Sequence, residues 1–387
     1  MATPAKLAAV LSVVCSAALW GGTPLGSFLV TNDDIAPDIP NTATFYTIDA
    51  DGTLGATTSV VTGGGGIAGG FFAAARVIVV PSGSDACVFV SDALSGDIVG
   101  IDAATRKFAG LFRGGPTDSG TANGIGFAAS ATYLYANFTS TSTIATFEMQ
   151  SGCQLAFVSD IHAGGLNGGV PDGMAAGGGI LVVTYGDGSI ESFNISGGEP
   201  VSNGDLQNST GAADDYLPNG VIVTGDGHYA IFGDASTASV VEVSDISSGM
   251  LTPTLVYPLG PAWNSGSVRL SPDETVLYVS NDSAGQVTAG FFNSVTGQIQ
   301  PGCTSASLAG FYTAFSYIGG AGLQLATGSG GIVYVPEYGL GGPSRIGMLQ
   351  FTRSGSACML TEAPASPVTD PRATSEVLSI AVYPGAP

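Results

Sequence analysis

Positive charge is scarce in this sequence. The 387 residues include 9 Lys and Arg against 30 Asp and Glu, and the formal net charge is -21. A surface with this charge repels phosphate backbones and anionic lipid. The composition therefore argues against nucleic acid as a partner. A small-molecule or carbohydrate-like ligand fits it better, and nothing in the sequence identifies a partner protein.

Long hydrophobic runs are also missing beyond the N-terminus, so we expect no membrane span. The opening residues, MATPAKLAAVLSVVCSAALWGG, place Lys6 before an apolar core that runs from Leu7 to Trp20. This pattern is typical of a secretory signal peptide, approximately residues 1–20. The sequence thus predicts a secreted or periplasmic protein. No linker divides the remainder, so we expect one domain over residues 25–387.

Cysteines are few, and none lies in a CxxC motif or a Cys/His cluster, which argues against a zinc site. Apart from Cys15 in the signal peptide there are four, Cys87, Cys153, Cys303 and Cys358. An even number in an exported chain favours disulfides. The sequence also lacks a GxSxG elbow, a Walker loop and a dinucleotide fingerprint in a suitable setting, so we expect no organic cofactor.

What the sequence does contain is a repeat. Strand-like segments such as SFLVTN (27), ACVFVSD (86), TVLYVSN (275) and GIVYVPE (331) recur seven times, at offsets of 46 to 59 residues. Each is followed by a polar or glycine turn and a second strand, and an apolar strand precedes most of them. About four strands per 40–50 residues is the pattern of a β-propeller blade. The sequence predicts an all-β, seven-bladed propeller of four-stranded antiparallel blades.

The two ends of the repeat indicate how the ring closes. The first unit opens directly on SFLVTN, with no inner strand before it, whereas the chain finishes on an unpartnered strand, SEVLSIAVYP. We therefore expect the C-terminal segment to supply the inner strand of the first blade.

The same repeat indicates how the cysteines pair. Cys153, Cys303 and Cys358 fall at turns between third and fourth strands, and Cys87 follows a first-to-second turn. These turns share one rim of the ring. Cys303 and Cys358 belong to adjacent blades, as do Cys87 and Cys153, so we expect these two pairs.

Three segments resemble the seven-bladed lactonase-type propellers, the family of phosphogluconolactonase-like and carboxymuconate-cyclase-like proteins. They are FLVTND…ATFYTIDADGTLGA, SVRLSPDETVLYVSNDSAGQVTAGFFNSVTGQIQP and LSIAVYP. A local likeness to calcium-dependent gluconolactonase propellers lies in ANGIGFAASATYLYANF, VPDGMAAGGGILVVTYGDGSIESFN and LPNGVIV. The resemblance implies lactone chemistry. The His-rich loop of the lactonase family has no counterpart here.

Loops that lead into inner strands gather on one face of a propeller, around its channel. In the gluconolactonase-like family, the Asn of "NG" and the Asp of "PDGM" coordinate the metal, which implies Asn123, Asp172 and Asn219 here, and Glu376 could add a carboxylate. Converging oxygen ligands suit Ca²⁺. The alternative is that Asn-Gly and Asp-Gly are simply favoured turn dipeptides.

Two residues are candidates for catalysis. His162, expected in the loop that enters the fourth blade, could activate water against a lactone carbonyl. Arg269, on an inner strand, could hold a substrate carboxylate or a developing oxyanion. The alternatives are a solvated loop histidine and an arginine in a buried ion pair with a neighbouring blade.

Trp263, Tyr216 and Tyr312 lie in the same class of loop, either as apolar walls of a substrate site or as plugs between blades. The sequence thus predicts a lactonase-like propeller that hydrolyses a lactone or related ester at the channel mouth with Ca²⁺ assistance. The alternative is a non-catalytic extracellular binding or scaffold propeller.

Overall fold

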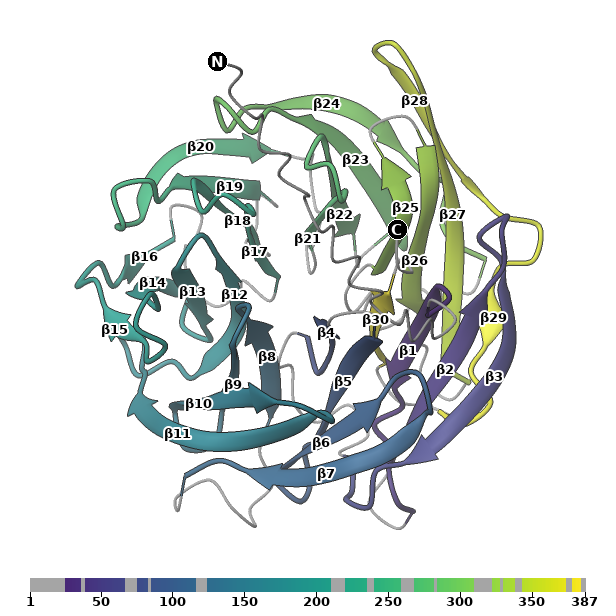
Figure 1. Cartoon of the computed structure of the whole chain (residues 1–387). Helices are drawn as coiled ribbons and strands as arrows, with labels where there is room; N and C mark the ends of the chain where they lie inside the picture. The colour runs from purple at the N-terminus through teal and green to yellow at the C-terminus, as the bar shows by residue number, and fades with distance from the viewer. Residues whose placement is uncertain are drawn as a thin grey trace, which may run out of the picture.

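The computed structural model describes residues 25–35, 39–66, 75–82, 85–115, 124–209, 220–234, 240–258, 268–281, 284–309, 322–327, 330–337, 343–373 and 378–383. Within these ranges every regular element is a β-strand, and the strands form seven antiparallel sheets. The sheets are arranged in a ring as the blades of a propeller (Figure 1). The predicted fold is confirmed. The described residues contain no helix with the length and apolar character needed to cross a bilayer.

Blade 1 joins the two ends of the chain. From the channel outward its strands are β30 (Ser379–Tyr383), β1 (Phe28–Asn32), β2 (Thr42–Ile48) and β3 (Leu54–Val61). In the antiparallel pairing of β30 with β1, Ala381 lies opposite Val30. The predicted closure of the ring by a C-terminal inner strand is confirmed (Figure 1).

The other blades follow in chain order, each from its inner strand outward. Blade 2 has β4 (Val77–Ser82), β5 (Asp85–Asp92), β6 (Asp97–Asp102) and β7 (Lys107–Arg113). Blade 3 has β8 (Ile125–Ala129), β9 (Tyr133–Phe138), β10 (Thr143–Gln150) and β11 (Gln154–His162). Blade 4 has β12 (Pro171–Gly177), β13 (Ile180–Tyr185) and β14 (Ser189–Asn194), with β15 (Val201–Ser202) and β16 (Gln207–Asn208) both paired to β14.

Blade 5 has β17 (Val221–Val223), β18 (Tyr229–Asp234), β19 (Val240–Asp245) and β20 (Thr252–Pro258). Blade 6 has β21 (Val268–Leu270), β22 (Val276–Asn281), β23 (Gln286–Phe292) and β24 (Ile299–Thr304). Blade 7 has β25 (Gly322–Thr327), β26 (Gly330–Glu337), β27 (Arg345–Ser354) and β28 (Ala357–Glu362), and β29 (Val368–Thr369) also pairs with β27.

The core lies between the blades. Successive side chains of a strand point to opposite faces of its sheet. On β1, Phe28 and Val30 therefore pack with blade 2, whereas Leu29 packs with blade 7. The buried apolar residues that the structure describes form seven clusters, one at each contact between neighbouring blades. A single blade would expose both of its faces, which explains why the repeat folds only as a ring.

The alternating strand directions give the ring two different faces. Inner strands begin on one face, which also carries the connections between second and third strands; we call it the mouth face. The turns from inner to second strand and from third to outer strand lie on the opposite face. Among the described candidate site residues, Asp172 and His162 lie at strand ends on the mouth face.

On the opposite face a hydrogen bond recurs between neighbouring blades. The hydroxyl groups of Tyr135 and Tyr334 donate to the carbonyl oxygens of Gly198 (2.8 Å) and Gly52 (2.6 Å), which lie in third-to-outer turns of the next blade. Both glycines have positive φ, 94° and 83°. A Cβ atom at Gly52 would lie 2.4 Å from Ile332, so the turn needs glycine for its backbone conformation and for close approach.

Two disulfides join neighbouring blades. Cys87 bonds to Cys153, between blades 2 and 3, and Cys303 bonds to Cys358, between blades 6 and 7. Both expected pairs are confirmed. The predicted position of Cys303 and Cys358 at turns is wrong, because these residues lie on the outer strands β24 and β28. Their outer strands contact each other, which brings the two sulfur atoms together.

Candidate functional site

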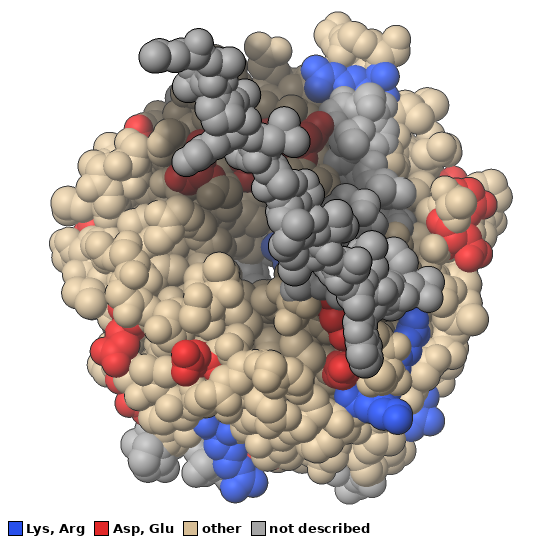
Figure 2. All heavy atoms as spheres, in the orientation of Figure 1, with Lys and Arg blue, Asp and Glu red and all other residues tan. Residues whose placement is uncertain are grey.

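A cavity of about 380 Å³ occupies the centre of the ring. Six of the inner strands contribute its lining, and the hollow is visible at the middle of the space-filling view (Figure 2). The lining residues are Ala75, Val77, Ile78, Val79, Phe127, Ala128, Ala129, Met174, Ala175, Ala176, Val221, Ile222, Val223, Arg269, Leu270, Ile380, Ala381 and Val382. The described side chains of the wall are thus apolar, with Arg269 as the one charged residue among them.

That charged side chain is Arg269, on β21. Its Nη1 atom donates a 3.1 Å hydrogen bond to the backbone oxygen of Val268. Among the described residues no carboxylate forms an ion pair with it, so the predicted alternative of an ion pair with a neighbouring blade finds no described partner. Burial lowers the pKa of the guanidinium, but an arginine keeps its proton in a protein. Among the described residues, no acid compensates this positive charge in the channel.

Asp172 lies where β12 enters the channel. The register of β12 against β13 shifts between Pro171 and Gly173, so Asp172 is the extra residue of a β-bulge. Bulges re-aim side chains and are frequent beside active sites. The residue is 6% exposed, and no described group donates a hydrogen bond to its carboxyl oxygens. Burial, and then the charge of Asp187, raise the pKa of Asp172 to about 7.

The backbone that leads to Asp172 is held by neighbouring polar groups. Asn137, on the second strand of blade 3, donates to the Pro171 oxygen (2.5 Å) and accepts from the Gly126 N–H (2.5 Å). Asp187 accepts from the N–H groups of Asn167 (2.7 Å) and Gly169 (3.1 Å) in the preceding loop. The bulge is therefore positioned by hydrogen bonds from two blades.

The same arrangement recurs between blades 1 and 2. There Asn32 donates to the backbone oxygen of Arg76, just before β4 (3.3 Å). Arg76 in turn forms a buried ion pair with Asp34. The mouth thus carries a compensated cation at blade 2, whereas Arg269 stands deeper in the channel without a described counter-charge.

His162 lies further from the channel than Asp172. It is the last residue of the outer strand β11, opposite Thr143, and its side chain is exposed. Three strand spacings of about 4.8 Å separate an outer strand from the inner strand of its blade. His162 is on the mouth face, as expected from the sequence, but at the outer side of blade 3 and not among the residues that line the cavity.

Most of the remaining predicted site residues lie outside the described residues. They are Asn123, Asn219 and Glu376 of the expected Ca²⁺ site, and Trp263, Tyr216 and Tyr312 of the expected substrate walls. Asp172 is the only expected calcium ligand that the structure describes. Within the described ranges, no three His, Cys, Asp or Glu side chains are grouped in a way that could hold a metal ion.

Sequence reasoning missed a group of buried acids on the mouth face. Asp33 accepts hydrogen bonds from the hydroxyl groups of Thr31, Thr42 and Thr44, and Asp370 accepts one from Tyr46 (2.5 Å). Burial, and then the charge of Asp370, raise the pKa of Asp33 to about 8. The polar run TND at the end of β1 was the available signal, since such residues seldom follow a buried strand without a partner.

Two further acids share this property. Asp92 accepts from Asn41 (2.9 Å) and Thr62 (2.8 Å), and burial raises its pKa to about 6. Glu337 is 2% exposed, and neither of its carboxyl oxygens has a described hydrogen-bond partner. Burial, followed by the charge of Glu362, raises the pKa of Glu337 to about 8. Burial therefore raises the pKa of several carboxyl groups on this face.

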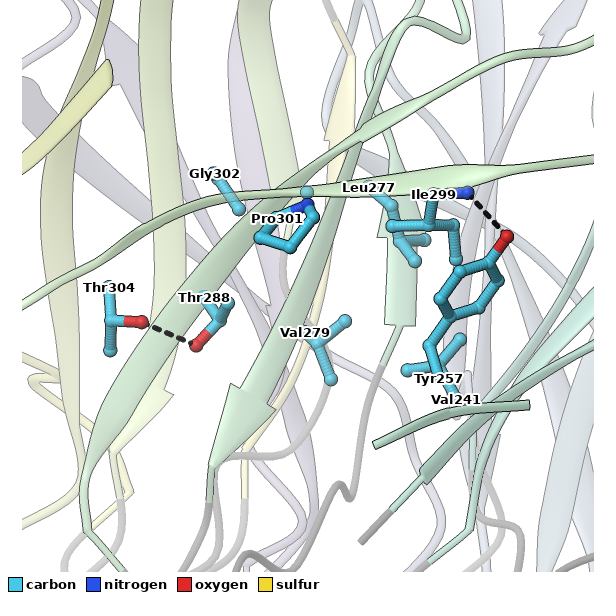
Figure 3. Close-up of a pocket in the computed structure, with 11 residues that line it drawn as sticks. Val241, Tyr257, Leu277, Val279, Thr288, Ile299, Pro301, Gly302 and Thr304 are labelled. Atoms are coloured by element: carbon cyan, nitrogen blue, oxygen red, sulfur yellow. Dashed lines mark hydrogen bonds between the residues drawn. The ribbon is translucent and has the colours of Figure 1, made fainter. Parts of the chain in front are cut away.

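A second cavity, of about 210 Å³, lies between blades 5 and 6 (Figure 3). Its polar wall groups bond to one another. The Ile299 N–H donates to the Tyr257 hydroxyl (2.8 Å), and the Thr288 and Thr304 hydroxyl groups lie 3.0 Å apart. Val279 and Leu277 supply apolar surface. No acid, histidine or cysteine lines it, so this cavity offers no group for acid–base chemistry.

Neither a protein-family model nor a curated protein sequence matches the chain. Solved structures do match. A protein from Lactobacillus plantarum has a TM-score of 0.65 at 13% identity, covering 93% of this chain and 99% of that one. A functionally unknown protein from Desulfotomaculum acetoxidans gives 0.63 at 13% identity, covering 92% and 99%. A putative 6-phosphogluconolactonase from Bacteroides uniformis gives 0.54 at 15% identity, covering 71% and 80%. At these identities the comparisons show the fold, and the chain resembles the lactonase-type propellers in that respect, as its sequence indicated.

Proposed function

We propose that the protein is a lactonase-type hydrolase that opens a lactone ring at the mouth of the central channel. The observation that carries the proposal is the placement of Asp172. Asp172 is the bulged residue at the start of an inner strand, and its carboxyl group is buried. No described group donates a hydrogen bond to this carboxyl group. Arg269 stands in the channel into which β12 leads. The structural likeness to a lactonase-type propeller supports the same reading.

In the proposed reaction the Asp172 carboxylate acts as the general base. It takes a proton from a water molecule, whose oxygen attacks the lactone carbonyl carbon. The guanidinium of Arg269 stabilises the negative charge that develops on the carbonyl oxygen. The ring C–O bond then breaks, and Asp172 returns the proton to the leaving oxygen. The product is a hydroxy acid whose new carboxylate faces Arg269.

Calcium is part of the proposal as a ligand of Asp172, whose carboxylate has the oxygen chemistry that Ca²⁺ requires. A cation bound there would polarise the lactone carbonyl. Melting curves with Ca²⁺ and with a chelator test this point. Binding to the folded state should raise the stability by about 2.7 kcal/mol at a hundredfold excess over the dissociation constant, and Asp172→Ala should abolish the gain. Identical wild-type curves would remove calcium from the proposal and leave the general-base role in place.

The test of the reaction is kcat/KM on a panel of lactones. We expect Asp172→Asn to lower kcat/KM by about 10²- to 10⁴-fold, the usual contribution of a general base. Asp245→Asn is the matched control, because Asp245 caps Ser247 (2.8 Å) in a turn on the opposite face. His162→Ala tests the catalytic role that the sequence suggested. Undiminished activity in Asp172→Asn would overturn the assignment.

A second candidate function is non-catalytic binding of a ligand in the channel. The apolar side chains of the described wall and an arginine with no described counter-charge favour it, since such a site binds an anion without needing an acid or a base. A wild-type protein that binds a channel ligand and hydrolyses no lactone would establish this function instead.

We also propose that the protein is exported. The two disulfides support this, because such bonds persist in oxidising compartments and are rare in the cytosol. N-terminal sequencing of protein recovered from the cell exterior should find cleavage close to residue 20. Recovery of uncleaved protein from the cytosol would contradict it.

A further inference from the structure

The side chains of the channel are unsuited to a polyhydroxylated ligand. Apart from Arg269, the described residues that line the cavity are all Ala, Val, Ile, Leu, Phe or Met. A sugar lactone would bring several hydroxyl groups into this wall, and each would exchange its hydrogen bonds to water for contact with apolar side chains. Burying a polar group without a partner costs free energy. Burying hydrocarbon surface against the same side chains is instead favourable, by roughly 25 cal/mol of free energy per Å².

Arg269 requires an anion in the same place. A guanidinium cannot escape burial by losing its proton, and a buried charge is tolerated when it is paired. Among the described residues its only hydrogen-bond acceptor is a backbone oxygen, at 3.1 Å. Asp34, an acid on the mouth face, is already paired with Arg76. None of the described acids therefore competes with a carboxylate that a ligand brings to this arginine.

The free edges of the inner strands complete the site. Each inner strand pairs with a neighbour on one side only, so its other edge presents backbone N–H and C=O groups toward the axis of the ring. These groups can form hydrogen bonds to an ester or hydroxyl group of a ligand. They do not replace the several charged side chains that a phosphorylated sugar would require.

We propose that the channel takes amphiphilic carboxylates with a hydrocarbon body, which places apolar lactones, and not sugar phosphates, as the substrate class. The hydrocarbon lies along the aliphatic wall, and the carboxylate of the ring-opened hydroxy acid pairs with Arg269. The naming of a substrate class rests on the proposed lactonase function, whereas the binding of the carboxylate does not. A volume of about 380 Å³ falls within the range of ordinary small-molecule pockets and well above the ~150 Å³ cavity that holds benzene. It suits a medium-length alkyl chain.

Calorimetric titration with three probes tests the binding. Decanoate carries the hydrocarbon and the charge, decanol carries only the hydrocarbon, and gluconate carries the charge on a polyhydroxylated body. We expect decanoate to bind wild-type protein most tightly and gluconate to show no binding at concentrations that saturate with decanoate. Arg269→Leu keeps the wall apolar and should raise the decanoate dissociation constant at least tenfold while leaving that of decanol within about twofold.

Two further variants test whether the ligand binds at this site. Arg113→Leu is the matched control, since Arg113 is an exposed arginine paired with Asp97 at 2.8 Å, and it should leave decanoate binding unchanged. Ala175→Phe narrows the cavity and should weaken decanoate and decanol alike. Gluconate that binds as tightly as decanoate, or decanoate binding that Arg269→Leu leaves unchanged, would overturn the inference.

Hydrolysis is measured separately, with δ-decalactone and glucono-δ-lactone. Decanoate binding without turnover of either lactone would overturn the proposed hydrolase and the substrate class that rests on it, and support the carboxylate site. Turnover of glucono-δ-lactone in preference to δ-decalactone would overturn the substrate class and support the hydrolase. Preference for δ-decalactone together with decanoate binding at Arg269 supports both.

Discussion

At the scale of single residues, several carboxyl groups of the molecule are buried. Asp33 is fully buried on the mouth face, and its pKa rises to about 8 from an ordinary value of 3.8 because of burial and of the neighbouring Asp370. The folded state therefore holds this proton over a pH range in which the unfolded chain has lost it. The stability contributed by the bound proton is fully present below pH ~4 and is lost as the pH rises through about 8.

We therefore expect the free energy of unfolding to fall between pH 4 and pH 8, with Asp33 contributing up to about 1.4 kcal/mol per pH unit. Asp33→Asn should flatten this fall, because an amide has no proton to lose. Asp51→Asn serves as the control. Asp51 is exposed and bonded to Thr53, and its pKa is lowered, so it does not contribute to a fall in this range. Denaturant titrations at several pH values measure the effect, and an equal slope in wild type and Asp33→Asn would contradict it.

At the scale of elements, second strands are tied to the turns of the following blade. Tyr135, Tyr278 and Tyr334 occupy equivalent positions on β9, β22 and β26, and all three are fully buried. The hydroxyl groups of Tyr135 and Tyr334 bond to turn carbonyl oxygens, whereas that of Tyr278 has no described partner. The three strands thus provide a natural comparison of the same side chain with and without its hydrogen bond.

Replacing each tyrosine with phenylalanine exploits that comparison. Tyr135→Phe and Tyr334→Phe should each destabilise the fold by about 1 kcal/mol, because each leaves a turn carbonyl without its donor. Tyr278→Phe should be neutral or stabilising, since it removes a buried hydroxyl that lacks a partner. Chemical denaturation gives the three values. A loss in Tyr278→Phe as large as in the other two would show that ring packing, not the hydrogen bond, sets the cost.

The cavity between blades 5 and 6 allows a second comparison of strands. Val279 points into this space from β22 (Figure 3), and Val90 occupies the equivalent position on β5, fully buried among the residues of blades 1 and 2. Val279→Ile should stabilise the fold by up to about 0.8 kcal/mol, the value of one buried methylene. Val90→Ile should destabilise it by about 1 kcal/mol or more through overpacking. Chemical denaturation measures both variants. Equal shifts of their denaturation midpoints from that of the wild type would show that the cavity does not accept the added methylene.

At the scale of the whole molecule, ring closure depends on one short strand. β30 pairs with β1 over five residue pairs, and it also carries Ile380 and Tyr383 into the clusters on either side of blade 1. Deleting residues 378–387 should expose the edge of β1 and remove both contacts, so the variant should aggregate or lose its cooperative melt. Deleting only residues 384–387 keeps β30 whole and should melt like the full chain. Cooperative melting of the longer deletion would contradict this account of closure.

How much of this follows from sequence depends on whether a feature repeats. The blades, the closing strand and both cysteine pairs were predictable, because each follows from the period of the strands and from the missing inner strand ahead of Ser27. The proximity of Asp33 and Asp370 was not, since these residues stand at opposite ends of the chain and meet only across the contact between blades 7 and 1. The bulge at Asp172 likewise breaks the alternation that the sequence pattern assumes. Arg269 was placed on an inner strand, but the lack of a described counter-charge depends on all the surrounding blades.

The pairing of β1 with β30 also has a consequence in time. Of the strands that the structure describes, β1 is synthesised first and β30 last, so the innermost neighbour of β1 does not yet exist while the other six blades emerge. Until then the hydrogen-bonding edge of β1 stays open to any other strand. The ring can therefore reach its final form only after synthesis of this region is complete, and for an exported chain that order allows passage through a membrane to precede folding.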